Sequence, residues 1–341
     1  MPNLSKPFMA TFPYFHPLTL HDLEPMLRRR PGEIKLGERM WIGDPEKTNA
    51  RFVIVGIPED IGVRANHGIG GARTLWPAFL KGFLNMHHSS FLPADQIAVW
   101  GAFDFSPLEK DLQDPDAFAL RPLVDQIDAA VLPVIQKIVA LGKIPVVIGG
   151  GHNNAYPILQ GCATGSGETK PMATINIDAH ADFRVMEGRH SGNAFRYAWE
   201  NGYLDKYAVV GLQSYQNHAL ILEMFLEEAD LLGISWERIF LKEELTLDEA
   251  LDQAVRHTGP LDSGLEFDID SIKLMASSAW SPNGFTNAQG RHIVMHLIKA
   301  KKPVYIHFCE GAVALDTGET DPLVGKYVAT LLADAIVAFN S

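Results

Sequence analysis

The stretch Thr174–Arg184, TINIDAHADFR, decides the fold of this sequence, because it joins an apolar run to three closely spaced metal-ligand side chains. Asp178, His180 and Asp182 alternate with alanines. In an extended backbone, residues two apart point to the same side, so these side chains would converge where the strand ends. Charged groups at such a place are costly unless they are paired or bound to a metal. The stretch therefore predicts a buried strand that ends in a metal site.

Two other clusters share this arrangement. Asp268 and Asp270 alternate in LEFDIDSI, and His152 follows three glycines in IGGGH. Alone, each is weak evidence, since a solvated strand end or a tight turn with an incidental histidine explains it equally well. However, all three clusters follow predicted strands, and ligands in open α/β sheets bind beyond the carboxyl ends of the strands. The six residues are therefore predicted to hold two divalent metals that activate one water.

Short apolar runs alternate with amphipathic stretches from residue 52 onward, and several runs are continuous Val/Ile/Leu segments typical of a parallel sheet. Strands are predicted at Phe52–Gly56, Ile97–Trp100, Ile144–Ile148, Met172–Ile177, Tyr207–Leu212, Arg238–Leu241, Gly264–Ile269 and Val304–Phe308. Helices are predicted at Leu123–Leu141, Asn193–Asn201, Asn217–Leu232, Leu247–His257, Gln289–Ala300 and Pro322–Asn340. This order predicts a single doubly wound α/β domain over residues 51–341. Residues 1–50 are predicted to form an arm packed on that body, with a short helix near His21–Arg28.

Composition restricts the function classes. The chain has 341 residues, of which 47% are apolar, and its net charge is −12. That charge argues against nucleic acid as a partner, because a phosphate-binding face needs clustered Lys and Arg. Only two cysteines occur, Cys162 and Cys309, which fits a reducing compartment. The first residues lack a signal segment, and no run approaches the roughly 20 apolar residues of a membrane helix. We therefore expect a cytoplasmic protein without a membrane partner.

The predicted ligand set comprises four carboxylates and two imidazoles, with no thiolate. Such a set suits Mn²⁺, with Fe, Co, Ni or Zn as alternatives. Zinc alone more often takes His or Cys in a tetrahedral site. The cofactor is accordingly predicted to be two Mn²⁺ ions.

Several motifs together resemble the ureohydrolase family, which includes arginases, agmatinases and formimidoylglutamases. IGGGHNN, NIDAHADFR and FDID resemble its three signature motifs, GIPEDIGVRANHGIGGA is similar to its first strand and glycine-rich loop, and CEGA matches the place of its substrate-side glutamate. The resemblance runs from about residue 52 to the C-terminus. It implies an arginase-like α/β fold with a mostly parallel, eight-stranded sheet and a binuclear Mn²⁺ centre. By this resemblance one metal takes His152, Asp178, Asp182 and Asp268, and the other takes Asp178, His180, Asp268 and Asp270. Asp178 and Asp268 would bridge the two.

Within the family, the RHSGN-F pattern of EGRHSGNAFRYA resembles formimidoylglutamases. It implies hydrolysis of N-formimidoyl-L-glutamate to L-glutamate and formamide. Arg184, with Arg189 or Arg196, is then predicted to bind the glutamate carboxylates, for which a guanidinium fork is well suited. A surface salt bridge explains each arginine equally well.

The remaining site residues are assigned roles by the same resemblance. Glu310 is predicted to bind the cationic end of the substrate. The leaving amine is predicted to receive its proton through Asp270 or His190.

Two departures from the family pattern keep the substrate open. After FDID the chain continues with SIKLMASSAWSPNGFT instead of a short Asp-Pro segment, and Glu266 stands where a small hydroxyl residue is frequent. Both are expected near the substrate wall. The alternatives are therefore a guanidino substrate such as arginine, agmatine, a guanidino acid or guanidine, or a metal-binding relative without catalysis. In each case the partner is a small molecule, and a homo-oligomer is compatible with the sequence.

Overall fold

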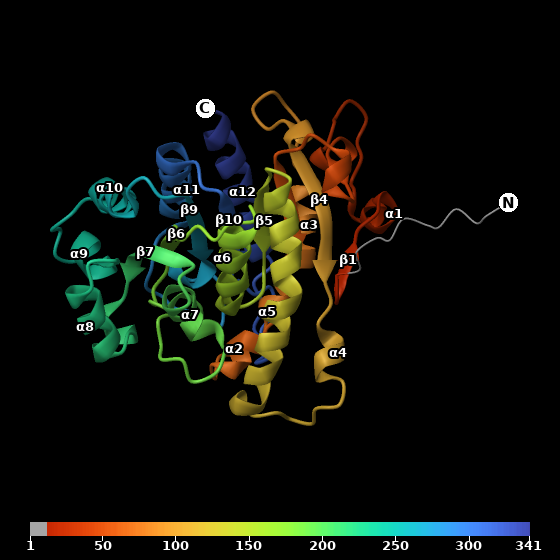
Figure 1. Ribbon diagram of the computed structural model, residues 1–341. Coiled ribbons are helices and arrows are strands. Elements are labelled where there is room, and N and C mark those ends of the chain that lie inside the picture. Colours follow the sequence, from red (N-terminus) through yellow and green to blue (C-terminus); the bar gives the residue numbers. More distant parts are fainter. Residues whose placement is uncertain (1–11) are drawn as a thin grey trace.

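The apolar runs of the sequence form a central sheet in the computed structural model, which describes residues 12–341 (Figure 1). Eight of its parallel strands are β3 (Phe52–Gly56), β4 (Ile97–Phe103), β5 (Ile144–Ile148), β6 (Met172–Ile177), β7 (Leu204–Leu212), β8 (Leu231–Ser235), β9 (Ser263–Asp268) and β10 (Tyr305–Cys309). They lie in the order β4-β3-β5-β10-β9-β6-β7-β8. The predicted α/β fold with a mostly parallel sheet is therefore confirmed, but the sheet has ten strands in the described residues instead of the eight that were predicted.

Two short strands that the sequence pattern did not predict extend the sheet at one edge. β1 (Phe15–Pro17) pairs antiparallel with β4, and β2 (Trp41–Ile42) pairs parallel with the same strand. Between them, the short helix expected near His21–Arg28 is α1 (Leu20–Leu23), followed by a single 3₁₀ turn.

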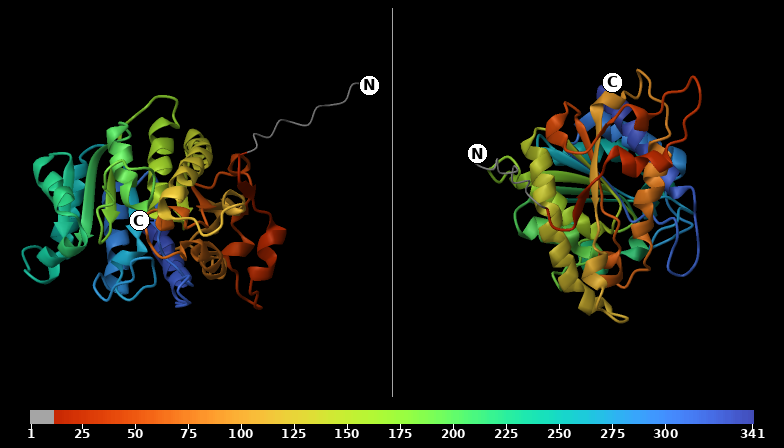
Figure 2. Two further views of the ribbon diagram at one scale, coloured as in Figure 1. Left: turned by 90° about the horizontal axis from the view of Figure 1, so that it is seen from below. Right: turned by 90° about the vertical axis from the view of Figure 1, so that its right-hand side faces the viewer.

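Helices cover both faces of the sheet, as the two views of Figure 2 show. One layer contains α3 (Leu75–Phe83), α10 (Leu247–Thr258), α11 (Asn287–Lys301) and α12 (Val324–Asn340). The other contains α5 (Ala117–Ala140), α6 (Ala155–Thr164), α7 (Ala194–Glu200) and α8 (Ala219–Glu227). Alternate residues of each strand enter the two hydrophobic cores: Phe52 and Ile54 of β3 pack into one, and Val53 and Val55 into the other. Burial on both faces explains why the strands are continuous apolar runs.

One predicted strand is wrong. Arg238–Leu241 lies within and just after α9 (Trp236–Phe240), and the strand at this place is β8, whose first two residues were predicted as the end of a helix. The Ser235 side chain accepts a hydrogen bond from the Arg238 N–H and so caps the start of α9. This cap starts a helix in a segment whose apolar residues resemble a short strand.

The sheet order explains why distant sequence clusters become neighbours. β5, β10, β9 and β6 are adjacent in the sheet centre, although they are far apart in the chain. His152, Glu310, Asp268 and Asp178 lie at or just beyond the carboxyl ends of these four strands. The centre of the sheet therefore presents all the predicted metal ligands at one rim.

Two further observations concern membrane-spanning helices and the two cysteines. Among residues 12–341, none of the helices is long and apolar enough to cross a membrane. Cys162 and Cys309 are both free thiols.

Candidate metal centre

The turn between β5 and α6 presents His152 to the rim. Gly150 has a φ of +78°, a left-handed backbone that favours glycine, and a Cβ there would lie 2.5 Å from Asn154 Nδ2. The buried carboxylate of Glu59 accepts hydrogen bonds from Gly151 N at 3.0 Å and from Asn154 Nδ2 at 2.6 Å. The glycine motif is thus a tight turn that a buried carboxylate holds in place.

The DAHAD segment bends sharply after β6. Asp182 has a φ of +46°, so the segment is not the extended continuation that the alternation suggested. Asn217 supports the bend, because its Oδ1 accepts from Ala181 N and its Nδ2 donates to Ala179 O, both at 2.9 Å. The three ligand side chains do converge, but a braced turn, not strand alternation, brings them together.

One group of four side chains surrounds a single point. Nδ1 of His152 lies 3.0 Å from Asp182 Oδ2 and 3.1 Å from Asp268 Oδ2. The same nitrogen lies 3.2 Å from Asp178 Oδ2. These are the four residues that the family resemblance implies for one metal.

A second group adjoins the first. Nδ1 of His180 lies 3.0 Å from Asp270 Oδ2 and 3.5 Å from Asp178 Oδ1. Asp178 therefore contributes one carboxylate oxygen to each group. Asp268 directs Oδ2 at His152, while its Oδ1 accepts a hydrogen bond from Asp270 N at 2.8 Å. Bridging by Asp268 stays a prediction.

The residues fit a metal centre. His152 Nδ1 and Asp270 Oδ1 are buried without a hydrogen-bond partner. Burial and the neighbouring charges of Asp270 and Asp178 raise the pKa of Asp268 well above its ordinary range. Burial likewise raises the pKa of Asp182 to about 6. Divalent cations would satisfy the unpartnered atoms and relieve the repulsion among the carboxylates.

Glu310 forms a separate part of the wall. Its backbone has a φ of +63°, a strained conformation for a residue other than glycine, and such strain clusters at functional sites. Oε1 accepts a hydrogen bond from His152 N at 2.8 Å, and Oε2 accepts one from Ser278 Oγ at 2.7 Å. Burial raises the pKa of Glu310 to about 8.

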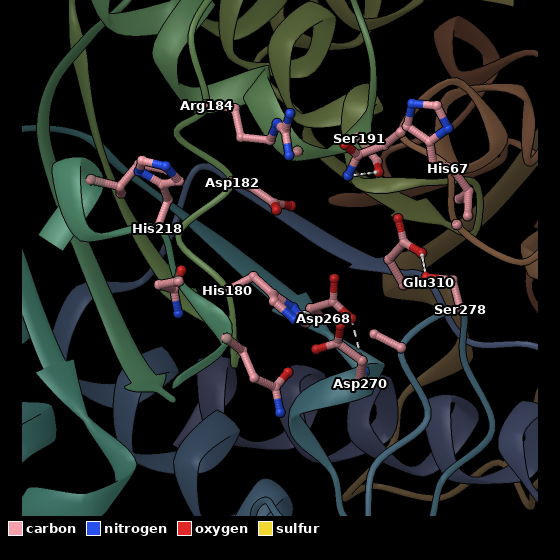
Figure 3. Close-up of a pocket in the computed structure, with 18 residues that line it drawn as sticks. His67, His180, Asp182, Arg184, Ser191, His218, Asp268, Asp270, Ser278 and Glu310 are labelled. Carbon is pink, nitrogen blue, oxygen red and sulfur yellow. Dashed lines mark hydrogen bonds and ion pairs between the residues drawn. The ribbon is translucent and has the colours of Figure 1, made fainter. Parts of the chain in front are cut away.

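A cavity of about 280 Å³ opens in front of these residues (Figure 3). Asp268, Asp270 and Glu310 line its buried floor, whereas the Arg184 side chain is 52% exposed at its mouth. Figure 3 shows Arg184 across the cavity from Asp270. The Arg184 guanidinium forms an ion pair with Glu187, with 2.8 Å between Arg184 Nη2 and Glu187 Oε1. The cavity is therefore acidic at its floor and carries a cation at its mouth.

The other two predicted substrate arginines lie elsewhere. Arg189 is buried between Tyr156 and Tyr197, and its guanidinium donates to Asp128 Oδ2 and to the Asn153 carbonyl, both at 2.8 Å. These bonds occupy the side chain and brace the residue next to His152. Arg189, which was predicted to bind the substrate, therefore does not line the cavity in this structure.

Arg196 is also withdrawn from the cavity. It projects from α7, pairs with Glu200, and lies over the rings of Phe183 and Trp199. Its Nη1 contacts Met224 Sδ at 3.0 Å. Arg196 thus packs α7 against α8 and does not line the cavity.

His190 is likewise not positioned to reach a substrate. Its ring is fully buried, Nδ1 accepts a hydrogen bond from Gly192 N, and Nε2 lies 3.3 Å from Glu187 Oε1. Burial and the charges of Arg121 and Arg184 lower the pKa of His190 to about 4. Its neighbours Ser191 and Gly192 line the cavity, but His190 does not. The structure therefore does not bring His190 to the cavity, whereas Asp270, the other residue predicted to transfer the proton, lies on the cavity floor.

Some site residues were missed or misplaced by the sequence patterns. Glu266, expected at the substrate wall, is fully buried behind His152. His67 and His218 line the cavity, as does Ser278 from the segment after β9. His218 lies in the first turn of the helix predicted at Asn217–Leu232 and is the N-cap of α8, and this place near a helix start was a usable signal, since helix N-termini often face ligands. Ser278 lies in the segment SIKLMASSAWSPNGFT that was expected near the substrate wall, and His67 lies in the glycine-rich motif, but the sequence patterns assigned no role to either residue.

Comparisons with known proteins agree with this geometry. Residues 50–333 match the Arginase family. The formimidoylglutamase of Geobacillus thermodenitrificans (strain NG80-2) is 28% identical over 290 residues, which cover 82% of this chain and 80% of that protein. The crystal structure of Trypanosoma cruzi formiminoglutamase with Mn²⁺ has a TM-score of 0.72 at 21% identity, covering 91% of this chain and 99% of that one. Proclavaminate amidino hydrolase from Streptomyces clavuligerus gives 0.67 at 16% identity, with 92% and 98% covered.

At such low identity, likeness to the solved structures shows the fold alone. The family match covers most of the chain, and it includes every residue of the two ligand groups and Glu310. This chain therefore belongs to the arginase family, whose members bind a binuclear metal centre, and it is a metal-dependent hydrolase of linear amidines.

Proposed function

We propose that this enzyme hydrolyses N-formimidoyl-L-glutamate to L-glutamate and formamide, with two Mn²⁺ ions as its cofactor. The observation that carries the proposal is the separation of charge along the cavity. Asp268 and Asp270 at the floor are 3% and 4% exposed, and Arg184 at the mouth is 52% exposed. The substrate has the complementary separation, with a cationic amidine at one end and two carboxylates at the other. The relatives named formimidoylglutamase support the same substrate.

The metal follows from the donor set. Mn²⁺ suits four carboxylates and two imidazoles, and the Trypanosoma cruzi structure of the same fold is described with Mn²⁺. Bound there, two divalent cations supply a water of lowered pKa and an electrostatic field that favours negative charge at the reacting centre. The six predicted ligands would hold the two cations in the two groups that share Asp178.

The chain's own residues bind the substrate and move the proton. Glu310 accepts hydrogen bonds from the amidinium N–H groups, and the positive charge of the amidinium favours the ionised carboxylate that burial disfavours. Asp270, whose Oδ1 has no hydrogen-bond partner, takes the proton from the attacking water and donates it to the departing amine. The bond between the amidine carbon and the glutamate nitrogen breaks, and the carbon leaves as formamide. Arg184 binds a substrate carboxylate at the mouth.

A substrate panel tests the proposal. Mn²⁺-loaded protein is assayed with N-formimidoyl-L-glutamate, its aspartate homologue, arginine, agmatine, a guanidino acid and guanidine, and released formamide and urea are quantified separately. We expect formamide release from the glutamate compound with the highest kcat/KM. A higher kcat/KM with urea release from any guanidino compound would overturn the substrate assignment. Two bound metals without turnover of any compound would favour a non-catalytic relative.

A further inference from the structure

An ionisable pair is buried directly behind the metal ligands. Glu266 on β9 and His307 on β10 are both fully buried and lie opposite each other in the register of the two parallel strands. His307 Nδ1 lies 2.6 Å from Glu266 Oε2. Neither residue lines the cavity, so neither contacts the substrate. Burying a carboxylate in the sheet centre is costly, and an apolar pair would pack there without that cost.

The pair faces the ring of one metal ligand. Glu266 Oε2 lies 3.4 Å from Nε2 of His152, on the side of the ring opposite the three ligand carboxylates. No hydrogen-bond partner is aligned with either ring nitrogen in residues 12–341. A histidine that binds a metal through Nδ1 is neutral and carries its proton on Nε2. That buried N–H then needs an acceptor, and Glu266 is the carboxylate beside it.

We propose that Glu266 and His307 are positioning residues for the metal centre: Glu266 accepts the Nε2–H of His152, which directs the Nδ1 lone pair at the metal, and His307 holds Glu266 in place. A carboxylate behind a ligating imidazole fixes its tautomer and makes it a better ligand. The proposal rests on the metal-binding part of the proposed function and not on the identity of the substrate.

His307 also connects the pair to the turn that carries His152. Its Nε2 lies 3.4 Å from the carbonyl oxygen of Gly149, at the start of that turn. The His307 ring therefore contacts both Glu266 and the end of β5. Through Glu266 it supports the side chain of His152, and through Gly149 it supports the backbone turn that carries His152. His180, the imidazole of the second group, is 26% exposed at the cavity and has no comparable carboxylate behind it in the part of the chain that the structure describes.

The two metal positions should therefore depend on Glu266 unequally. Loss of such a supporting partner typically lowers metal affinity about 10- to 100-fold. We expect Glu266→Gln to weaken one of the two Mn²⁺ equivalents by about that factor and to change the other by less than about threefold. Calorimetric Mn²⁺ titration of metal-free protein measures both. The visible absorption of the Co²⁺-loaded protein should change in parallel, because it reports ligand geometry without any substrate.

Substitutions of His307 distinguish a role in positioning Glu266 from a role in packing the core. Asparagine keeps an N–H donor near the place of Nδ1, whereas leucine fills similar space without a donor. His307→Asn should retain most of the Mn²⁺ affinity that His307→Leu loses. Asp60→Asn is the matched control, because Asp60 is buried and paired with Arg64 and Arg73 but contacts no metal ligand. It should lower the free energy of unfolding and leave both affinities unchanged.

The outcomes are decisive in each direction. Wild-type affinities in both Glu266→Gln and His307→Leu would show that the pair only packs the core and would overturn the proposal, as would equal weakening of both metals. If Glu266→Gln does not fold, the comparison of the two His307 variants decides alone. A wild-type protein that binds two metals but prefers a guanidino substrate would refute the proposed function and leave this inference intact. A wild-type protein that binds no metal would refute both.

Discussion

Arg184, Arg189 and Arg196 lie close together in the sequence but have three different environments in the structure. Arg184 lines the cavity mouth, Arg189 is buried against Asp128, and Arg196 packs α7. Their residue type predicted carboxylate binding, but the direction of each side chain depends on the bend after β6 and on the start of α7. Sequence spacing carries no information on either. The grouping of the six predicted metal ligands was predictable, because clustered carboxylates and imidazoles are rare in a sheet interior. The positions of the arginines were not, because arginines are common at surfaces.

The structure singles out Arg184 for a test of substrate recognition. Arg184→Ala should raise KM for N-formimidoyl-L-glutamate roughly fivefold to tenfold, because an exposed charge-assisted contact contributes about 1 kcal/mol. kcat should change little, since a contact to a remote carboxylate is made equally in the ground and transition states. Steady-state kinetics measure both values. Arg196→Ala is the matched control and should leave KM unchanged. Equal changes in the two variants would remove Arg184 from the binding site.

The backbone conformation of the turn between β5 and α6 determines where His152, a predicted metal ligand, is placed. Its glycines were recognised in the sequence, but Glu59, which holds the turn, was not, because a buried carboxylate next to a strand end looks like an ordinary loop charge. The strands were predictable where both faces are buried, as in β5 and β6. β8 was missed because its residues are only partly buried and its first two residues, Leu231 and Leu232, continue the apolar pattern of the helix predicted before it.

Two glycines with similar backbone but different surroundings test this element. Gly150 and Gly167 have φ values of +78° and +92°, yet a Cβ on Gly167 would meet nothing within 4 Å. Gly167→Ala should cost only the roughly 1 kcal/mol of a left-handed alanine. Gly150→Ala should cost at least about 1–2 kcal/mol more, because it displaces the turn, and it should also weaken Mn²⁺ binding. Urea unfolding and Mn²⁺ titration measure these effects. Equal costs with unchanged metal affinity would contradict the role of the turn.

At the scale of the whole molecule, the centre of the sheet brings together carboxylates that repel one another when no cation is bound. Burial raises the pKa of Asp182 to about 6, above the value of about 3.9 for an unfolded aspartate. The folded, metal-free protein therefore holds this proton more tightly than the unfolded chain does. The associated stability is present at low pH and is lost as pH rises from about 4 through about 6.

Metal binding reverses this dependence, because the ligands must be deprotonated. The Tm of Mn²⁺-loaded protein should therefore exceed that of metal-free protein by a margin that widens between about pH 5 and pH 7. The lowered pKa of His190, which destabilises the fold as pH falls, acts on both forms and cancels in the difference. Thermal unfolding with excess Mn²⁺ and with a chelator measures the margin. A margin that is constant or narrows with rising pH would show that the cluster is not the metal site.

The antiparallel strand β1 has a consequence for solution behaviour. It covers Gly101–Phe103 of β4, and Phe15 packs edge-on against Trp100 at 4.8 Å between ring centroids. A deletion ending at Pro17 would bare the backbone groups of an apolar parallel sheet, and such an edge is a template for pairing with another chain. The truncated enzyme should then form aggregates whose light scattering grows with protein concentration, while a deletion ending at Thr11 leaves β1 in place and should remain dispersed. A few residues remote from the metal ligands would thus set the colloidal stability of the whole enzyme.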